Sequence, residues 1–148
     1  MLSAQYEIIT NRILSGKEDI RIHGKVIFKK SPGKLPSHSC LRVVFEDVSL
    51  ADQGSIVYKT EEFNVSDADI SAHYMYEFKT KKPKENHEFY AISAVLNVGW
   101  CADEDGDDWI RNFDFLSDTT LYVPLSKGVT DYEVDVPVVF YCEYFHFL

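Results

Sequence analysis

The sequence lacks the features that identify several large classes of protein. No apolar run approaches the roughly 20 residues of a membrane-spanning helix, and no basic start followed by an apolar stretch marks a leader. Basic residues are few: 15 Lys and Arg stand against 24 Asp and Glu, for a net charge of -9. This balance repels phosphate backbones and anionic lipids. The sequence therefore predicts a soluble chain with no transmembrane segment and no nucleic-acid partner, cytoplasmic if Met1 is the native start.

Cysteine and catalytic motifs are also scarce. Cys40, Cys101 and Cys142 are widely spaced and form no CxxC pair, so neither a metal centre nor a redox motif is indicated. Each lies among apolar residues, which favours buried, inert thiols; a single disulfide with one free thiol is the alternative. No nucleophile elbow, glycine-rich phosphate loop or His-Glu-Xaa-Xaa-His helix is present. We therefore expect no enzymatic activity.

The composition that remains is that of one globular domain rich in β-formers. The 148 residues are 45% hydrophobic, 26% charged and 14% aromatic, which suits a single domain over 1–148. Apolar residues at helical spacing predict a short N-terminal helical segment over 1–18. A sandwich then spans 20–125, and 126–148 supplies an additional C-terminal strand.

From Ile20 onward the apolar period changes to two, as a half-buried strand requires. The segment from Phe89 to Trp100 is apolar on both faces and is typical of a central strand. Polar turns separate the expected strands, which are 20–28, 41–47, 55–65, 73–81, 89–100, 110–116, 119–125 and a last segment from 132. The pattern predicts an all-β fold: a two-sheet antiparallel immunoglobulin-like sandwich of about seven strands with a short N-terminal helix.

An acidic run, 103–108, is the most conspicuous local feature. Its carboxylates repel one another unless water or a cation neutralises them, and calcium suits an oxygen-rich loop. The run does not fit an EF-hand, because Asp108 stands where that motif needs glycine. A calcium-binding C2-like module is the alternative function, with Asp103, Asp105, Asp107 and Asp108 as metal ligands. An exposed acidic hairpin tip is the structural interpretation. Trp100 and Trp109 then face each other across the hairpin and close the core beside it, and the alternative is a binding surface of exposed aromatic residues.

The C-terminal tail, 136–148, is dense in β-formers and would aggregate if left exposed. A terminal strand that completes a sheet is the favoured interpretation. The functional alternative is an edge strand that pairs with another protein or peptide, including a second copy of this chain.

Several short motifs follow one another along the chain, beginning with Gly24 and Val26 and including the segment from Asp47 to Asp52. Their order resembles that of the YbaY/YscW family of small bacterial envelope lipoproteins. The resemblance covers 20–125, and its most specific part is the segment Asp47-Val48-Ser49-Leu50-Ala51-Asp52. Other matching residues are Gly24 and Val26, Leu35 and Pro36, Tyr90, Ile92 and Ala94, and Asp118, Thr119 and Tyr122 to Leu125.

The resemblance implies a non-enzymatic binding or assembly module, pilotin-like or chaperone-like, which holds a polypeptide at a sheet edge or apolar groove. For the YscW branch it implies a pilotin that escorts a secretin subunit to the outer membrane. If a leader has been removed, the expected compartment is then the bacterial periplasm or outer membrane. The segment 47–52 also has a physical interpretation as a turn, in which aspartate and serine side chains cap backbone amides two residues on.

Overall fold

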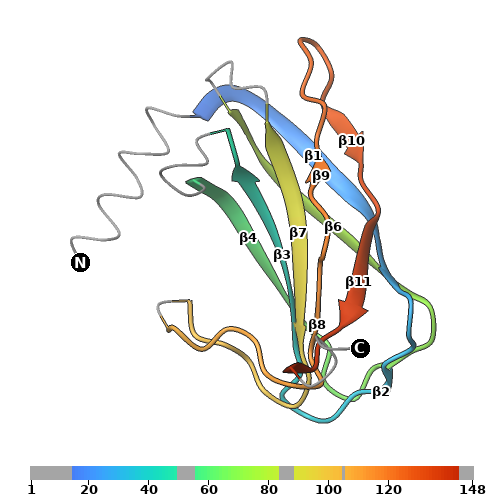
Figure 1. Ribbon diagram of the computed structural model, residues 1–148. Helices are drawn as coiled ribbons and strands as arrows, with labels where there is room; N and C mark the ends of the chain where they lie inside the picture. The colour runs from blue at the N-terminus through green and yellow to red at the C-terminus, as the bar shows by residue number, and fades with distance from the viewer. Residues whose placement is uncertain (1–14, 50–55, 84–88, 105, 144–148) are drawn as a thin grey trace.

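The computed structural model describes residues 15–49, 56–83, 89–104 and 106–143 (Figure 1). All regular elements of these residues are β-strands, as the sequence predicts for an all-β fold. They are β1 (Ser15–Phe28), β2 (Gly33–Lys34), β3 (Cys40–Asp47), β4 (Ile56–Asn64), β5 (Asp69–Ile70), β6 (His73–Pro83), β7 (Tyr90–Asn97), β8 (Phe115–Leu116), β9 (Leu121–Tyr122), β10 (Asp131–Glu133) and β11 (Val136–Phe140). In this part of the chain, no helix is long and apolar enough to cross a bilayer.

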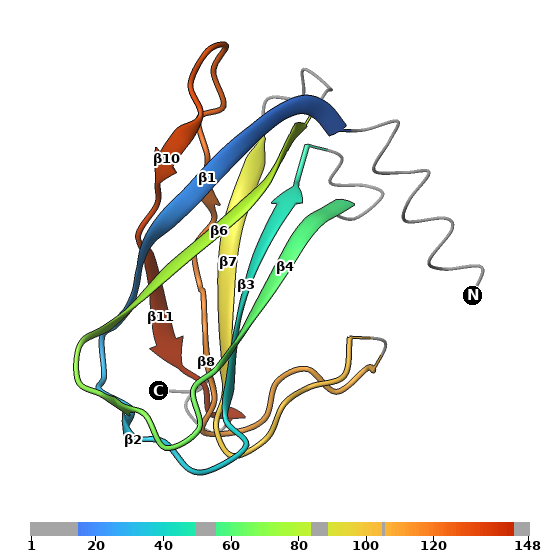
Figure 2. The same cartoon turned by 180° about the vertical axis from the view of Figure 1, so that it is seen from behind.

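Nine of the strands form one sheet, and β2 and β5 form a separate pair. The main order is β10-β1-β11-β8-β7-β3-β4; in addition, β6 pairs with β1, and β9 pairs with β7. The sheet curls, so that β6 and β1 cross over β7, β3 and β4 (Figures 1 and 2). Most pairs are antiparallel, but β1 is parallel to both β10 and β11.

The predicted separation into two immunoglobulin-like sheets is not confirmed, because β11 joins the two halves. Val136 lies opposite Val26 of β1, and Phe140 lies opposite Phe115 of β8. Period-two alternation tells which face of a strand is buried, but it does not tell which strands pair. The strands therefore form one curled sheet whose two halves are connected through hydrogen bonds.

Three predicted elements differ from the structure, and one of them is the strand predicted over 119–125, of which only Leu121–Tyr122 is regular. The N-terminal helix over 1–18 lies mostly outside the described residues, but 15–18 belong to β1. The strand predicted over 110–116 is reduced to Phe115–Leu116, because the preceding residues form an irregular loop around Asp114. The predicted C-terminal strand is present, and an interruption at Val134 and Asp135 divides it into β10 and β11.

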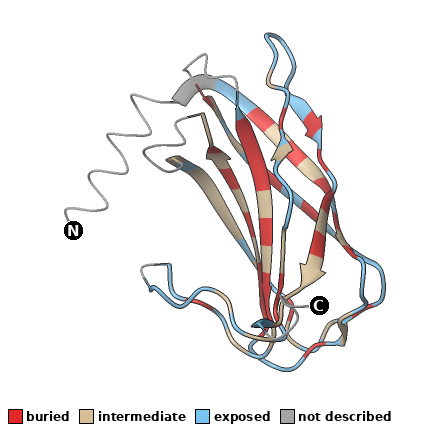
Figure 3. Cartoon of the chain, viewed as in Figure 1, coloured by how far each residue is buried: buried red, intermediate tan, exposed pale blue. Residues whose placement is uncertain are grey.

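The core lies between the two layers of the curl (Figure 3). Alternate residues of the long strands are buried there, and β7 is buried along most of its length, as predicted for a central strand. The largest fully buried side chains include Tyr90, Phe45, Ile20, Ile22, Leu41, Ile92 and Leu96.

One long side of the curl is closed by the C-terminal strands, and we call it the closed side. Here β1 pairs first with β10 and then with β11, and the change of partner occurs at Gly24. The backbone of Val134, between β10 and β11, lies very close to Gly24. A Cβ atom on Gly24 would lie 2.0 Å from the Val134 carbonyl oxygen, so only glycine fits. Tyr76 donates its hydroxyl to the same oxygen at 2.6 Å, and Lys25 donates its backbone N–H to Asp135 at 2.9 Å. Burial of the Tyr76 hydroxyl, and after it the charge of Asp135, raises the pKa of Tyr76, which keeps it a donor.

Candidate functional site

The opposite long side of the curl, formed by the outer edges of β4 and β6, is not closed, and we call it the open side. Among the strands that the structure describes, β4 pairs only with β3, and β6 pairs only with β1. In the two views β4 lies at the margin of the sheet, and β6 runs diagonally across β7 (Figures 1 and 2). Unpaired strand edges present backbone donors and acceptors that another chain can use.

An aromatic pair joins the two strands near one end of the open side. The rings of Phe63 on β4 and Tyr74 on β6 lie 5.9 Å apart between centroids, at 63°. Phe63 lies opposite the buried Leu41 of β3, so its side chain is on the inner face of the sheet. The open side thus has a small apolar contact at one end.

Further along β4, charged side chains occupy the same inner face. Glu61 lies opposite the buried Val43, and Lys59 lies opposite the buried Phe45. Lys59 and Glu61 form an ion pair, with Nζ 3.6 Å from Oε2, and each side chain is about one-third exposed (39% and 35%). Inward-pointing charges are one of the devices by which natural edge strands reject unwanted partners.

A bulge adds a second such device. The register of β3 and β4 shifts between Phe45 and Glu46, so that Tyr58 is an extra residue in β4. The Tyr58 ring contacts Phe45 at 5.9 Å and Tyr90 at 5.7 Å. The edge of β4 can therefore pair with another strand, but the inward charges and the bulge restrict which strand sequences fit it.

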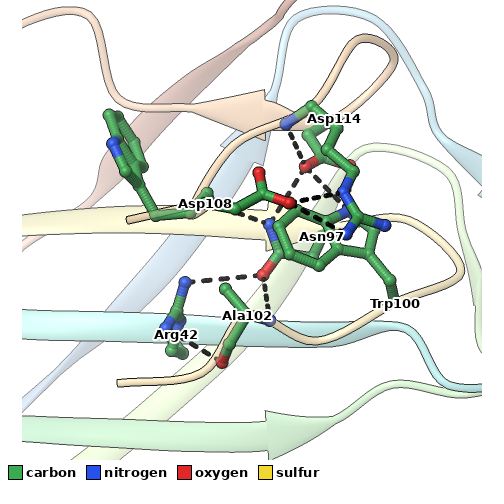
Figure 4. Close-up of polar contacts among 8 residues, drawn as sticks. Arg42, Asn97, Trp100, Ala102, Asp108 and Asp114 are labelled. Atoms are coloured by element: carbon green, nitrogen blue, oxygen red, sulfur yellow. Dashed lines mark hydrogen bonds and ion pairs between the residues drawn. The ribbon is translucent and has the colours of Figure 1, made fainter. Parts of the chain in front are cut away.

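The acidic loop between β7 and β8 is organised by a buried carboxylate, that of Asp114 (Figure 4). Asp114 accepts hydrogen bonds from the backbone N–H of Val98 and of Arg111, both at 2.9 Å. It also accepts from the Asn97 amide at 3.0 Å and from the indole N–H of Trp100 at 3.1 Å. A carboxylate that satisfies so many donors fixes the two ends of the loop together.

The predicted calcium ligands lie on this loop. Asp103, Asp107 and Asp108 are exposed, and Asp105 lies outside the described residues. Asp108 forms an ion pair with Arg111, with Nη2 2.9 Å from Oδ2, so at least one of the four carboxylates has a cationic partner within the chain. Calcium binding by Asp103, Asp105, Asp107 and Asp108 stays a prediction, which a calorimetric titration tests.

The two tryptophans of the loop differ in their surroundings. The Arg111 guanidinium lies over the Trp100 ring, 3.8 Å from its centroid. The Trp109 side chain is instead about half exposed (48%). The sequence pattern does not indicate this arginine, because no spacing rule links a guanidinium to an indole across an irregular loop.

The favoured expectation of three inert thiols is wrong, and the alternative of a single disulfide with one free thiol is confirmed. Cys40, at the start of β3, and Cys101, in the loop after β7, form a disulfide with a Cα–Cα distance of 5.4 Å. The Glu62 carboxylate lies within 4.8 Å of both sulfur atoms, but disulfide sulfurs are not the thiolates that bind metals. Cys142 is the free thiol and is half-buried. The two joined cysteines are 61 residues apart, and only the pairing of β3 with β7 brings them together.

A charged cluster occupies the outer face of β1, β6 and β10. Arg21 contacts Glu77 at 2.5 Å and Asp131 at 2.7 Å, and His23 contacts Asp131 at 3.0 Å. The Arg21 hydrogen bonds hold the pKa of Glu77 and of Asp131 below their usual values. Glu77 and Asp131 are exposed, Arg21 and His23 are partly exposed, and all four are already paired, so they resemble a surface network more than a catalytic site.

Two further predictions have clear outcomes. The Asp47 carboxylate accepts a hydrogen bond from the backbone N–H of Ser49 at 2.8 Å, which confirms the capping predicted for the described part of 47–52; residues 50–52 lie outside it.

β11 lies between β1 and β8, so the C-terminal strand completes the sheet, as favoured. Its alternative use as an exposed edge does not apply to 136–140, and residues 144–148 lie outside the described part.

Comparison with known proteins gives a family and a fold. The family described as type III secretion system lipoprotein chaperone (YscW) matches residues 17–100. The structure is similar to that of an alternative pilotin from the type II secretion system of Vibrio cholerae, with a TM-score of 0.59 and 22% identity. That match covers 84% of this chain and 99% of the pilotin chain. A comparison with curated protein sequences found no significant match.

Proposed function

This chain belongs to the YscW family of type III secretion system lipoprotein chaperones, and from that premise we propose that it holds a secretin polypeptide at its open side. The role is one of binding and assembly. The observation that carries the proposal is the open side itself, where the β4 and β6 edges are unpaired among the described strands and the rings of Phe63 and Tyr74 meet at one end.

The chemistry of the open side suits an extended polypeptide. Backbone groups along an edge bind any strand, whereas side-chain pockets and charges select its sequence. On the inner face of β4, Phe63 offers an apolar contact, and Lys59 and Glu61 offer charges of both signs. A segment with alternating apolar and charged residues complements this surface better than an anionic membrane or a nucleic acid does.

The disulfide supports a role in the bacterial envelope. Disulfides form and persist in oxidising compartments and are rare in the cytoplasm. The Cys40–Cys101 bond joins a strand of the sheet to the loop that carries Asp114. In an envelope chaperone, this covalent bond holds the loop after β7 against the sheet without a cofactor.

The test is binding of overlapping peptides that tile the secretin of the same secretion system, measured by fluorescence anisotropy. We expect one region to bind and the Val57→Lys variant to weaken its binding about tenfold, because lysine on an edge strand disfavours strand addition. Val57 lies on β4 and is 53% exposed, so the substitution leaves the core intact.

The matched control is Val129→Lys, in the turn before β10, where the valine is 40% exposed. This variant is expected to bind like the unmodified protein. The proposal is wrong if no secretin peptide binds, or if the two variants weaken binding equally. Hydrogen exchange gives a second readout, because a bound strand slows exchange of β4 amides and leaves those of β11 unchanged.

A further inference from the structure

We infer that β4 also recognises a second copy of this chain, by pairing antiparallel with the β4 of its partner about a two-fold axis at Thr60. This pairing uses the same edge as the proposed function but does not depend on it, because it follows from the sequence and register of β4 alone. It differs from the self-association expected for the C-terminal strand, since β11 lies inside the sheet.

The geometry of antiparallel pairing leaves few registers. Two directly opposite residues either both direct their backbone groups at each other or both direct them away, and these two kinds of pair alternate along the ladder. A strand can therefore pair with its own copy only about a residue, never about the midpoint between two residues. For β4, the candidate centres in its regular part begin at Lys59, just after the bulge.

Charge then selects among the centres. A centre at Lys59 places two ammonium groups opposite each other, and centres at Glu61 or Glu62 place two carboxylates opposite each other. Like charges directly opposite are destabilising. A centre at Thr60 instead places Lys59 of each copy opposite Glu61 of the other, which gives two attractive pairs by symmetry.

The Thr60 centre also makes the fullest use of the strand. β4 runs from Ile56 to Asn64, so Thr60 is its middle residue, and two copies that pair about it overlap along the whole strand. A centre nearer either end leaves part of each strand without a counterpart. Lys59 and Glu61 already share one face through their ion pair, so the four charges of the dimer alternate in sign on that face.

The bulge and the inward charges explain why this pairing is selective and weak. They disrupt pairing with a strand of arbitrary sequence, whereas a second β4 carries the complementary charges at the required spacing. The bulge at Tyr58 limits the regular ladder to the central residues. The expected dimer is therefore reversible, with a dissociation constant in the micromolar to millimolar range.

Sedimentation velocity over a concentration series tests this pairing on the full chain without any other partner. The unmodified protein is expected to pass from monomer to dimer, and added salt weakens the dimer. Lys59→Glu and Glu61→Lys are each expected to raise the dissociation constant about tenfold or more, because each substitution turns two attractions into two repulsions. The double variant Lys59→Glu/Glu61→Lys restores the attractions and the dimer.

An equimolar mixture of the two single variants gives the sharpest readout. In a mixed pair, the two carboxylates of the Lys59→Glu copy lie opposite the two ammonium groups of the Glu61→Lys copy. The mixture is therefore expected to dimerise although neither variant does alone. Charge repulsion within each strand is unchanged by mixing, so only register-specific pairing predicts this recovery. Circular dichroism confirms that each variant is folded.

Thr60→Lys is a second, independent disruption, because it places two lysines at the axis. The proposed pairing is wrong if the unmodified protein stays monomeric up to millimolar concentration, if the single variants dimerise normally, or if their mixture stays monomeric. Such a failure leaves secretin binding untouched, because that is measured with secretin peptides under conditions in which the chain is monomeric.

Discussion

The closed and open sides of the curled sheet show two ways in which strands meet at a margin. On the closed side, β10 and β11 form ladders with β1. Where the two strands change over, Tyr76 donates to the Val134 carbonyl, the Lys25 backbone N–H donates to the Asp135 carboxylate, and Gly24 leaves room for the close approach. On the open side, two rings meet and the remaining edge carries charges. The closed side therefore depends on particular residues for stability, whereas the open side leaves binding groups unused within the described part of the chain.

The difference indicates where substitutions affect folding and where they affect association. When a buried backbone carbonyl loses its hydrogen-bond donor, the protein loses stability, because water cannot reach the carbonyl to form a replacement hydrogen bond. An exposed edge loses little when a side chain changes, because water already satisfies its backbone groups. Each of the following variants tests one part of this contrast.

The largest expected effect is that of Gly24→Ala on the closed side. A methyl group 2.0 Å from the Val134 oxygen forces β1 and the β10–β11 junction apart, so we expect a loss of about 3 kcal/mol or more in the free energy of unfolding. Gly106→Ala is the control, because its Cβ would meet neighbours at an ordinary 3.5 Å; we expect a change within about 0.5 kcal/mol. Urea titration measures both, and equal effects would contradict the steric role assigned to Gly24 on the closed side.

A smaller effect separates two tyrosines of the same strand. Tyr76→Phe removes the donor to the Val134 carbonyl and is expected to cost about 1–2 kcal/mol. Tyr74→Phe, on the open side, keeps the ring that contacts Phe63 and is expected to cost less than about 0.5 kcal/mol. Thermal unfolding of the two variants tests this prediction. If Tyr74→Phe lost more stability than Tyr76→Phe, the open side would contribute more to stability than the closed side, contrary to the prediction.

The smallest effect concerns acid stability at the outer face of the closed side. Arg21 lowers the pKa of Glu77 and Asp131 in the folded state, so these carboxylates stabilise the fold above their unfolded pKa values, near 4.5 and 3.8. That stabilisation is lost as the pH falls through the lower, folded values. Arg21→Gln is expected to be less stable at neutral pH, with the difference vanishing in acid. NMR titration should show both carboxyl pKa values rising; unchanged values would contradict the assignment.

Much of the fold could be predicted from the sequence, because alternation reports burial directly. The strands from Ile20, from Leu41 and from His73 agree with the structure to within a few residues, and β7 has the two buried faces expected of it. Pairing between distant segments was harder to predict. The parallel contact of Val26 with Val136 has no local signal, since the two residues are 110 positions apart.

The candidate site was less predictable than the fold. The acidic run can be recognised in the sequence because its charged residues are consecutive. The open side can be recognised only when the strand order is known. Lys59 and Glu61 could have been noticed as charges at inward positions of a strand, since the residues opposite them in β3 are apolar. The disulfide could not be chosen over free thiols for a similar reason, because no spacing rule joins cysteines 61 residues apart.

The parallel pairing of β1 with the C-terminal strands sets the order in which this chain can complete its fold. β1 is the first of the described strands along the chain, but its partners β10 and β11 are the last of them. Until residues 131–140 arrive, one edge of β1 has no strand beside it, and the curl cannot close. A chain that starts from an extended state therefore cannot complete its sheet until residues 131–140 are present. β10 and β11 then pair with the free edge of β1 and complete the curled sheet.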